Sequence, residues 1–262
     1  MRLPAKIGRR DTLQLLPSLD TPAQGPSPEP NPKPLLLNVG VTGHRAPVLT
    51  ATLVRTLRPA VYKVFSGIRE AALSLQESEA EFCSSTAPRL HLQTALATGA
   101  DQIAAICARS SGYFVQAMLP FEAHEYRKDF APGEELDTFE QAIAAADEIV
   151  ALPGDRSDAE GAYVRVGKLL VRTADIMIAI WDGEHGKGPG GTAHVVELAL
   201  QSSVPVIHID IDHGSDKVRM RALVASASGE YLGGSVREPE LYSRMLREVF
   251  KLTPAQSIPC AD

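Results

Sequence analysis

The glycine-rich bend before one predicted helix carries the groups needed to hold an anion. Gly188, Gly190 and Gly191 precede Thr192 near the start of the predicted helix 191–203. The first N–H groups of a helix lack backbone partners and carry a partial positive charge, so they stabilise a phosphate. Glycine leaves the backbone open to the phosphate oxygens, and Thr192 adds a hydroxyl donor. The alternative interpretation is an ordinary loop that ends in a threonine N-cap.

A second glycine turn carries an arginine. The stretch GVTGHR, residues 40–45, closes the first hydrophobic run and supplies two further donors, His44 and Arg45. The planar guanidinium donates two parallel hydrogen bonds, a geometry that fits a phosphate. Taken alone, the pattern is equally typical of a tight strand-to-helix turn with a solvated arginine.

Acidic residues follow two other hydrophobic runs. In ATGADQIAA, residues 97–105, Gly99 permits a turn and Asp101 enters the first turn of the next helix. A carboxylate there either caps the helix, for about 0.5 to 2 kcal/mol, or accepts hydrogen bonds from ribose hydroxyls. Asp182 follows the fifth run, and the charged segment 119–130 contains a tyrosine of interest, Tyr126.

Alternating elements must position these residues. The predicted strands are 35–41, 92–97, 113–119, 148–152, 175–181 and 204–210, and the predicted helices are 50–76, 99–110, 134–146, 159–174, 191–203 and 239–250. This alternation predicts an α/β fold, a doubly wound, mostly parallel, Rossmann-like sheet of about six strands flanked by helices. Ligands of such sheets bind beyond the carboxyl ends of the strands, where the motifs above lie.

Length and composition favour one large domain with a short arm. The chain has 262 residues, of which 44% are hydrophobic, enough for a substantial core. Residues 1–33 are predicted to be a disordered proline-rich arm, residues 34–213 the binding domain, and residues 214–262 an extension whose helix packs on that domain.

Charge and cysteine content exclude several classes of protein. The net charge of −6, without a long Lys/Arg cluster, argues against bulk nucleic-acid binding. Cys83, Cys107 and Cys260 have no metal-ligand or disulfide pattern, so neither a metal site nor a cofactor is predicted, and a reducing cytoplasm fits best. No apolar stretch approaches the roughly 18 to 20 residues that span a bilayer, so no membrane contact is expected.

Four stretches in order resemble the SLOG superfamily, the Rossmann-like group that contains DNA-processing protein A and the LOG phosphoribohydrolases. They are GVTGHR, TALATGADQIAA, MLPFEAHEYRKDF and ADIMIAIWDGEHGKGPGGTAHVVE, and they run from about residue 35 to residue 210. The resemblance implies a sensor module for a nucleotide-derived ligand, of the ADP-ribose or cyclic-nucleotide type, in a bacterial stress or anti-phage system. It also implies a homo-oligomer, whose effector would be a separate protein.

The resemblance also implies which residues face the ligand. The glycine turn at residues 43–45 would line one side, residues 99–101 another, and the bend before Thr192 would hold a phosphate. The complete set of predicted ligand-binding residues is Gly40, Thr42, Gly43, His44, Arg45, Gly99, Ala100, Asp101, Asp182, Gly188, Gly190, Gly191 and Thr192.

A LOG-like phosphoribohydrolase that acts on a nucleoside monophosphate is the catalytic alternative, with Glu197 and Arg165 as candidate catalytic residues. The enzymes resembled place a glutamate three residues after the threonine, whereas Glu197 lies five residues after Thr192. Five helical residues turn a side chain by about 500°, against about 300° for three, so the carboxylate points elsewhere. Enzyme activity therefore stays open, and a ligand-free assembly module is the third hypothesis.

Overall fold

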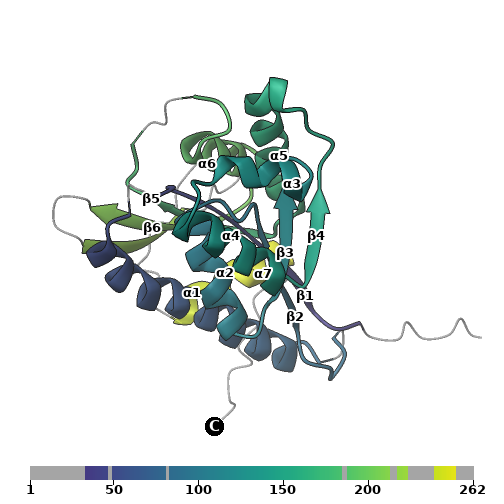
Figure 1. The fold of residues 1–262 in the computed structure, drawn as a ribbon. Coiled ribbons are helices and arrows are strands. Elements are labelled where there is room, and N and C mark those ends of the chain that lie inside the picture. The colour runs from purple at the N-terminus through teal and green to yellow at the C-terminus, as the bar shows by residue number, and fades with distance from the viewer. Residues whose placement is uncertain are drawn as a thin grey trace, which may run out of the picture. The chain divides into compact units, whose positions relative to one another are not determined.

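The computed structural model divides the chain into two units, Met1–Asn31 and Pro32–Asp262, and the described residues all belong to the second unit. Its described residues are 33–46, 49–80, 83–184, 188–212, 217–223 and 239–251 (Figure 1). Almost all of the predicted proline-rich arm lies outside these ranges. None of the helices within them is long and apolar enough to cross a membrane.

Seven strands form a single sheet. They are β1 (Leu36–Gly43), β2 (Arg89–Thr94), β3 (Phe114–Leu119), β4 (Glu148–Ala151), β5 (Ile176–Trp181), β6 (Val206–Asp212) and β7 (Lys217–Leu223). Their order is β4-β3-β2-β1-β5-β6-β7, and only the β6–β7 pair among them is antiparallel. The predicted doubly wound, mostly parallel sheet is therefore confirmed, and β7 is an addition that the sequence analysis missed.

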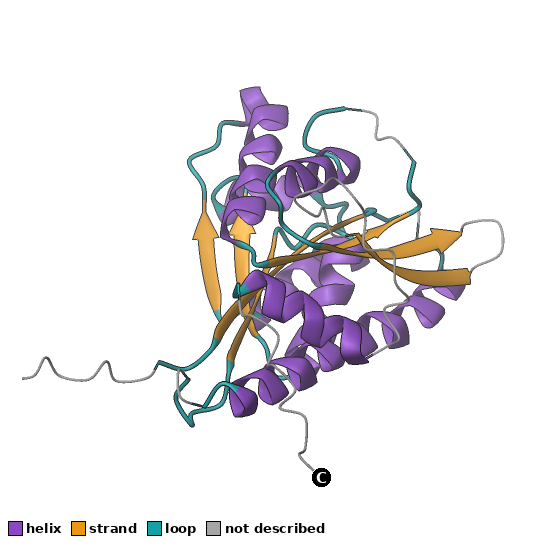
Figure 2. Ribbon diagram, turned by 180° about the vertical axis from the view of Figure 1, so that it is seen from behind, coloured by secondary structure: helices purple, strands orange, loops and turns teal. Residues whose placement is uncertain are grey.

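Helices cover both faces of the sheet. Those described are α1 (Ala51–Ser78), α2 (Ala100–Ser110), α3 (Ala123–Tyr126), α4 (Glu134–Ala145), α5 (Ala159–Thr173), α6 (Thr192–Gln201) and α7 (Pro239–Val249), with short 3₁₀ helices η1 (Arg127–Asp129) and η2 (Arg156–Asp158). Figures 1 and 2 show α1, α2, α4 and α7 on one side, and α5 and α6 on the other. Six helices match the predicted ones, and α3 lies within the charged segment 119–130, for which no helix was predicted.

The burial of β5 agrees with its place inside the sheet, next to the central strand β1. Every residue from Ile176 to Ile180 is buried, as expected of a strand with helices on both faces. The chain moves outward from β1 through β2 and β3 to β4, and then crosses back to β5 on the other side of β1. The connections that follow β1 and β5 therefore run in opposite directions along the sheet, which makes this pair of strands a topological switch point, where doubly wound sheets open a crevice.

Two aspartates fix the strand register on which that crevice depends. Asp175 lies just before β5, accepts a hydrogen bond from the N–H of Asn38 and donates its own N–H to the Asn38 carbonyl, each at 2.8 Å. Asp147 makes the same pair of bonds with Val115, at 2.8 and 2.9 Å. Each aspartate therefore holds the start of one strand against its neighbour.

Candidate functional site

A cleft of about 510 Å³ opens at the switch point between β1 and β5. This volume lies within the range of small-molecule sites in proteins. Most of the predicted ligand-binding residues line it: Thr42, Gly43, His44, Arg45, Asp101, Asp182, Gly190, Gly191 and Thr192. A larger hollow of about 740 Å³ lies along α1, β7 and α7, but none of the predicted residues lines it.

The remaining predicted residues shape the turns. A Cβ on Gly40 would lie 2.3 Å from the sulfur of Met177, so this glycine allows β1 and β5 to pack closely. Ala100 fills the space beside Gly43, where an added Cβ would lie 2.4 Å from the Ala100 Cβ. Gly188 is exposed, with no atom within 4 Å of the position of a Cβ.

Gly99 holds the β1–α1 turn in place. It has a φ of +88°, and a Cβ there would lie 2.7 Å from the His44 carbonyl oxygen. The next amide, that of Ala100, donates to this same oxygen at 3.0 Å, while the His44 N–H donates to Ile180 at 2.9 Å. The turn is thus fixed between β5 and α2 before any ligand enters.

His44 also joins two of the sequence motifs through its side chain. Its Nε2 lies 2.9 Å from a carboxylate oxygen of Asp182, which follows β5. The two residues are 138 positions apart in the sequence, and only the pairing of β1 with β5 brings them together. This contact sets one wall of the cleft.

Arg45 lies over an aromatic ring. Its guanidinium carbon is 5.2 Å from the centre of the Tyr163 ring, within the range of a cation–π contact. Within the described residues, no carboxylate lies within 4 Å of this guanidinium. Its hydrogen-bonding capacity is therefore not consumed by an acidic side chain, and Arg45 is exposed enough to meet a ligand.

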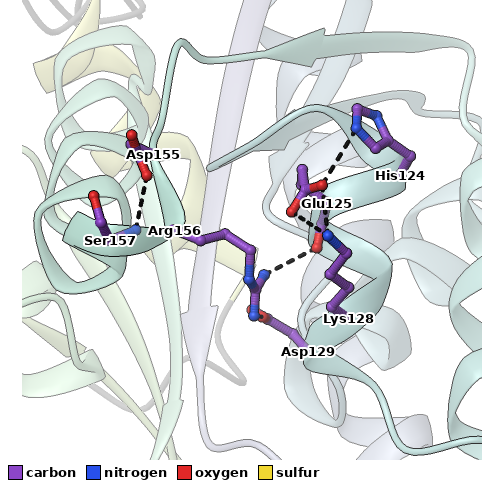
Figure 3. Close-up of polar contacts among 7 residues, drawn as sticks. All are labelled: His124, Glu125, Lys128, Asp129, Asp155, Arg156 and Ser157. Atoms are coloured by element: carbon purple, nitrogen blue, oxygen red, sulfur yellow. Dashed lines mark hydrogen bonds and ion pairs between the residues drawn. The ribbon is translucent and has the colours of Figure 1, made fainter.

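A polar network behind the ring holds Tyr163. Its hydroxyl donates to the carboxylate of Asp129, whose side chain is 8% exposed and also forms an ion pair with Arg156 at 2.8 Å. Arg156 further donates to the carbonyl of Glu125 at 2.9 Å (Figure 3). The loop before α5 is thereby tied to α3 and η1, and the tyrosine beneath Arg45 is held from behind.

The start of α6 offers unused backbone donors. Gly191 is the N-cap residue and makes no side-chain capping bond, and the first helical bond runs from Val195 to Gly191 at 3.1 Å. The amides of Thr192, Ala193 and the next residue therefore have no intrahelical acceptor, as at any helix start. Gly190, with a φ of +80°, donates its N–H to Nδ1 of His194 at 2.9 Å, which fixes the bend.

Asp101 is a buried carboxylate in the wall of the cleft. It is 5% exposed and accepts a hydrogen bond from the Thr94 hydroxyl at 3.0 Å. Burial raises its pKa to about 6, although that hydrogen bond and the charge of Arg45 act in the opposite direction. The N-cap of α2 is Gly99, which has no side-chain capping bond, so Asp101 does not fill that position.

Two tyrosines complete the cleft, and neither was among the predicted ligand-binding residues. Tyr126 is 1% exposed, and its ring packs edge-on against Phe130 and Phe139, with ring centres 5.2 and 5.4 Å apart. Burial raises the pKa of its hydroxyl. The sequence singles out Tyr126 as part of the charged segment 119–130. It gives no indication of a role for Tyr163, which lies within an amphipathic helix.

The two candidate catalytic residues lie outside the cleft lining. Glu197 is exposed on α6 and accepts a hydrogen bond from Gln201 at 3.1 Å. Arg165 is exposed on α5 and forms an ion pair with Asp158 at 3.0 Å. The five-residue spacing thus places the Glu197 carboxylate away from the pocket, as the helical geometry predicts.

No protein-family model matches the chain, and neither does any curated protein. Solved structures with a similar fold include DNA-processing protein A from Streptococcus pneumoniae, with 16% identity and a TM-score of 0.45 over 69% of this chain and 53% of that one. The Helicobacter pylori protein of the same name has 15% identity and a TM-score of 0.44, over 81% and 80%. A molybdenum cofactor carrier protein from Chlamydomonas reinhardtii has 16% identity and a TM-score of 0.35, over 66% and 75%.

DNA-processing protein A, a member of the superfamily that the four motifs resemble, is thus among the solved structures of similar fold. The chain spans about half of the Streptococcus pneumoniae protein.

One of these structures also corrects the exclusion of bulk nucleic-acid binding, which is wrong. The Helicobacter pylori protein is described by its single-stranded DNA binding mode. A net charge of −6 averages over all residues and does not report on any one face, so it could not support that exclusion.

Proposed function

We propose that the cleft binds a nucleotide-derived ligand, of the ADP-ribose or cyclic-nucleotide type, through its phosphate. The observation that carries this proposal is the meeting of two anion-binding groups in one cleft. The α6 start contributes amides without intrahelical acceptors, and Arg45 contributes a guanidinium with no acidic partner among the described residues. A phosphate between them accepts hydrogen bonds from both sides and lies at the positive end of the helix.

We further propose that the ligand is a signal rather than a substrate, in a bacterial stress or anti-phage system as the resemblance implies. The position of Glu197 and Arg165 outside the cleft supports binding without hydrolysis. Chromatography of a nucleoside monophosphate after incubation with the protein is expected to show no free base. Release of the base, lost on Glu197→Ala, would favour the hydrolase instead.

Calorimetry with Arg45→Ala tests the binding proposal. The titrants are ADP-ribose, a cyclic dinucleotide and the four ribonucleoside 5′-monophosphates. We expect at least one to bind the natural chain, and Arg45→Ala to weaken that binding by about 10- to 100-fold, because a charge-assisted hydrogen bond contributes about 1.5 to 3 kcal/mol.

Arg165→Ala is the matched control, since it removes an exposed arginine from the neighbouring helix outside the cleft. It is expected to leave the dissociation constant unchanged. An equal loss in both variants would assign the effect to general charge, and an absence of heat with every titrant would contradict the proposal.

A further inference from the structure

The wall of the cleft contains two buried polar groups that a phosphate does not satisfy. Asp101 comes from the first turn of α2 and Tyr126 from α3, and both line the cleft. A carboxylate repels a phosphate, so neither the α6 start nor Arg45 accounts for its presence. A different part of the ligand must meet this pair of side chains.

Tyr126 gives the independent indication of a ligand. Its side chain is almost completely buried, yet within the described residues its hydroxyl makes no hydrogen bond. The hydroxyl oxygen is itself accessible from the cleft, where water or a ligand can hydrogen-bond to it. Aromatic side chains surround the ring, so the cleft is where this hydroxyl finds a partner.

Asp101 has room for one further donor. Hydrogen bonds from the Thr94 hydroxyl and from the backbone N–H groups of Ala95 and Ala97 act on its carboxylate, and an ionised carboxylate has about four acceptor positions in all. At neutral pH the side chain is an acceptor, because its pKa of about 6 lies below 7. The hydroxyl of Tyr126 stays protonated and can both donate and accept.

We propose that Asp101 and Tyr126 recognise the hydroxyl groups of a sugar, so that the cleft selects ribonucleotides over deoxyribonucleotides. This inference rests on the proposed function, because the phosphate contact places the sugar. One ribose hydroxyl donates to the carboxylate, and its neighbour exchanges a hydrogen bond with the tyrosine hydroxyl. A deoxyribose lacks one of these hydroxyls, so one of the two side chains loses its partner in the ligand.

The position of Arg45 favours the sugar over the base. The charge of Arg45 acts on both Asp101 and Tyr126, so the three groups lie near one another. In a nucleoside 5′-phosphate the sugar directly follows the phosphate, and the N–H groups of the base lie farther away. With the phosphate on Arg45, the sugar hydroxyls are therefore the donors nearest to Asp101.

The size of the selectivity follows from the burial of the pair. Sites that hydrogen-bond a substrate hydroxyl through buried groups reject the analogue without it by factors of up to about 10⁴. Tyr126 and Asp101 are both at least nine-tenths buried. We expect the natural chain to bind an equimolar mixture of the four ribonucleoside 5′-monophosphates at least 100-fold more tightly than the corresponding deoxyribonucleotide mixture.

The test is calorimetry of both mixtures with Asp101→Asn and Tyr126→Phe. Each variant is expected to weaken ribonucleotide binding by at least 10-fold and to change deoxyribonucleotide binding much less, so that the two affinities approach one another. The matched control is Tyr113→Phe, a buried tyrosine outside the cleft whose hydroxyl donates to the carbonyl of Phe65. This control should keep the selectivity of the natural chain.

The possible results separate this inference from the proposed function. Equal binding of the two mixtures overturns the sugar selectivity and leaves the phosphate site standing. Binding of neither mixture overturns the sugar selectivity, and it overturns the proposed function as well only if ADP-ribose and the cyclic dinucleotide also give no heat. A variant that changes the preferred base, or that weakens both mixtures equally, assigns the residue to the base or to the loop and also overturns the inference. Circular dichroism of each variant confirms that it is folded, and Tyr126→Phe decides the matter where Asp101→Asn is unfolded.

Discussion

At the scale of single residues, Asp101 is a carboxylate held where burial disfavours its charge. Burial raises its pKa from 3.8 to about 6, a shift that corresponds to about 3 kcal/mol. The folded chain therefore binds the proton more tightly than the unfolded chain. The contribution to stability is fully present below about pH 4 and is lost as the pH rises through 6.

Asp101→Asn should remove this dependence. The amide oxygen still accepts from the Thr94 hydroxyl, but no charge has to be buried at neutral pH. We expect the variant to be more stable than the natural chain by up to about 3 kcal/mol at pH 7, with the difference disappearing near pH 4. Urea unfolding at a series of pH values measures it. A constant difference across that range would show that Asp101 does not titrate with a raised pKa.

The same residue shows how far the sequence alone can reach. The motif placed an acidic side chain near the expected ligand site, but its position in the first turn of a helix favoured helix capping when the residue was considered alone. Burial separates the two roles, and burial depends on α2 packing against β1 and on the Thr94 side chain from another strand. Tyr163 could not be predicted for a similar reason. The helical spacing of α5 does not distinguish the residue that faces the cleft from the other residues outside the buried stripe.

At the scale of elements, the β1–α1 turn depends on a glycine that starts a different helix. Gly99 and Gly133 are both N-cap residues with positive φ, at +88° and +99°, but their surroundings differ. A Cβ on Gly99 meets the backbone of His44 and Ala46, whereas a Cβ on Gly133 meets no atom within 4 Å. A comparison of the two glycines therefore separates the cost of backbone strain from the cost of a steric contact with the β1–α1 turn.

Alanine at the two positions should therefore have unequal effects. Gly133→Ala is expected to lower the free energy of unfolding by about 1 to 2 kcal/mol through backbone strain alone. Gly99→Ala is expected to lower it by about 3 to 4 kcal/mol, because the β1–α1 turn must also move. Urea unfolding gives both values, and calorimetry should show weaker ligand binding for Gly99→Ala only. Equal losses would mean that the contact with the turn relaxes without cost.

The elements themselves followed from hydrophobic periodicity wherever both faces were buried. The six parallel strands were predicted from short apolar runs between helices, although β2 (Arg89–Thr94) begins three residues before the predicted run 92–97 because His91 and Gln93 interrupt its apolar pattern. In β7 the charged residues Lys217 and Arg219 alternate with Val218 and Met220, so no such run exists. A half-exposed edge strand has this pattern, and a search for apolar runs passes over it.

At the scale of the whole sheet, the cleft lies at the reversal of strand order, so its walls come from segments far apart in the sequence. A ligand in the cleft therefore contacts β1, α2, α5 and α6 together. Ligand binding at 100 times the dissociation constant adds about 2.7 kcal/mol to the stability of the folded state.

For a folded unit of about this size, that gain raises the melting temperature by about 5 to 10 °C. Scanning calorimetry with ADP-ribose should show the shift in the natural chain, and a smaller shift of about 1 to 5 °C in Arg45→Ala at the same concentration, because the variant is expected to bind about 10- to 100-fold more weakly. A separate transition that stays in place when ligand is added would show that part of the sheet unfolds independently of the cleft.

The two edges of the sheet have a consequence for how the protein behaves in concentrated solution. On one side β4 has four residues, and on the other β7 presents exposed Lys217 and Arg219. A short strand offers few backbone groups for pairing, and positive charges along an edge repel the same edge of another molecule. Both features oppose the addition of a further strand from a neighbouring chain, and so they protect a sheet with a very apolar centre from edge-to-edge aggregation.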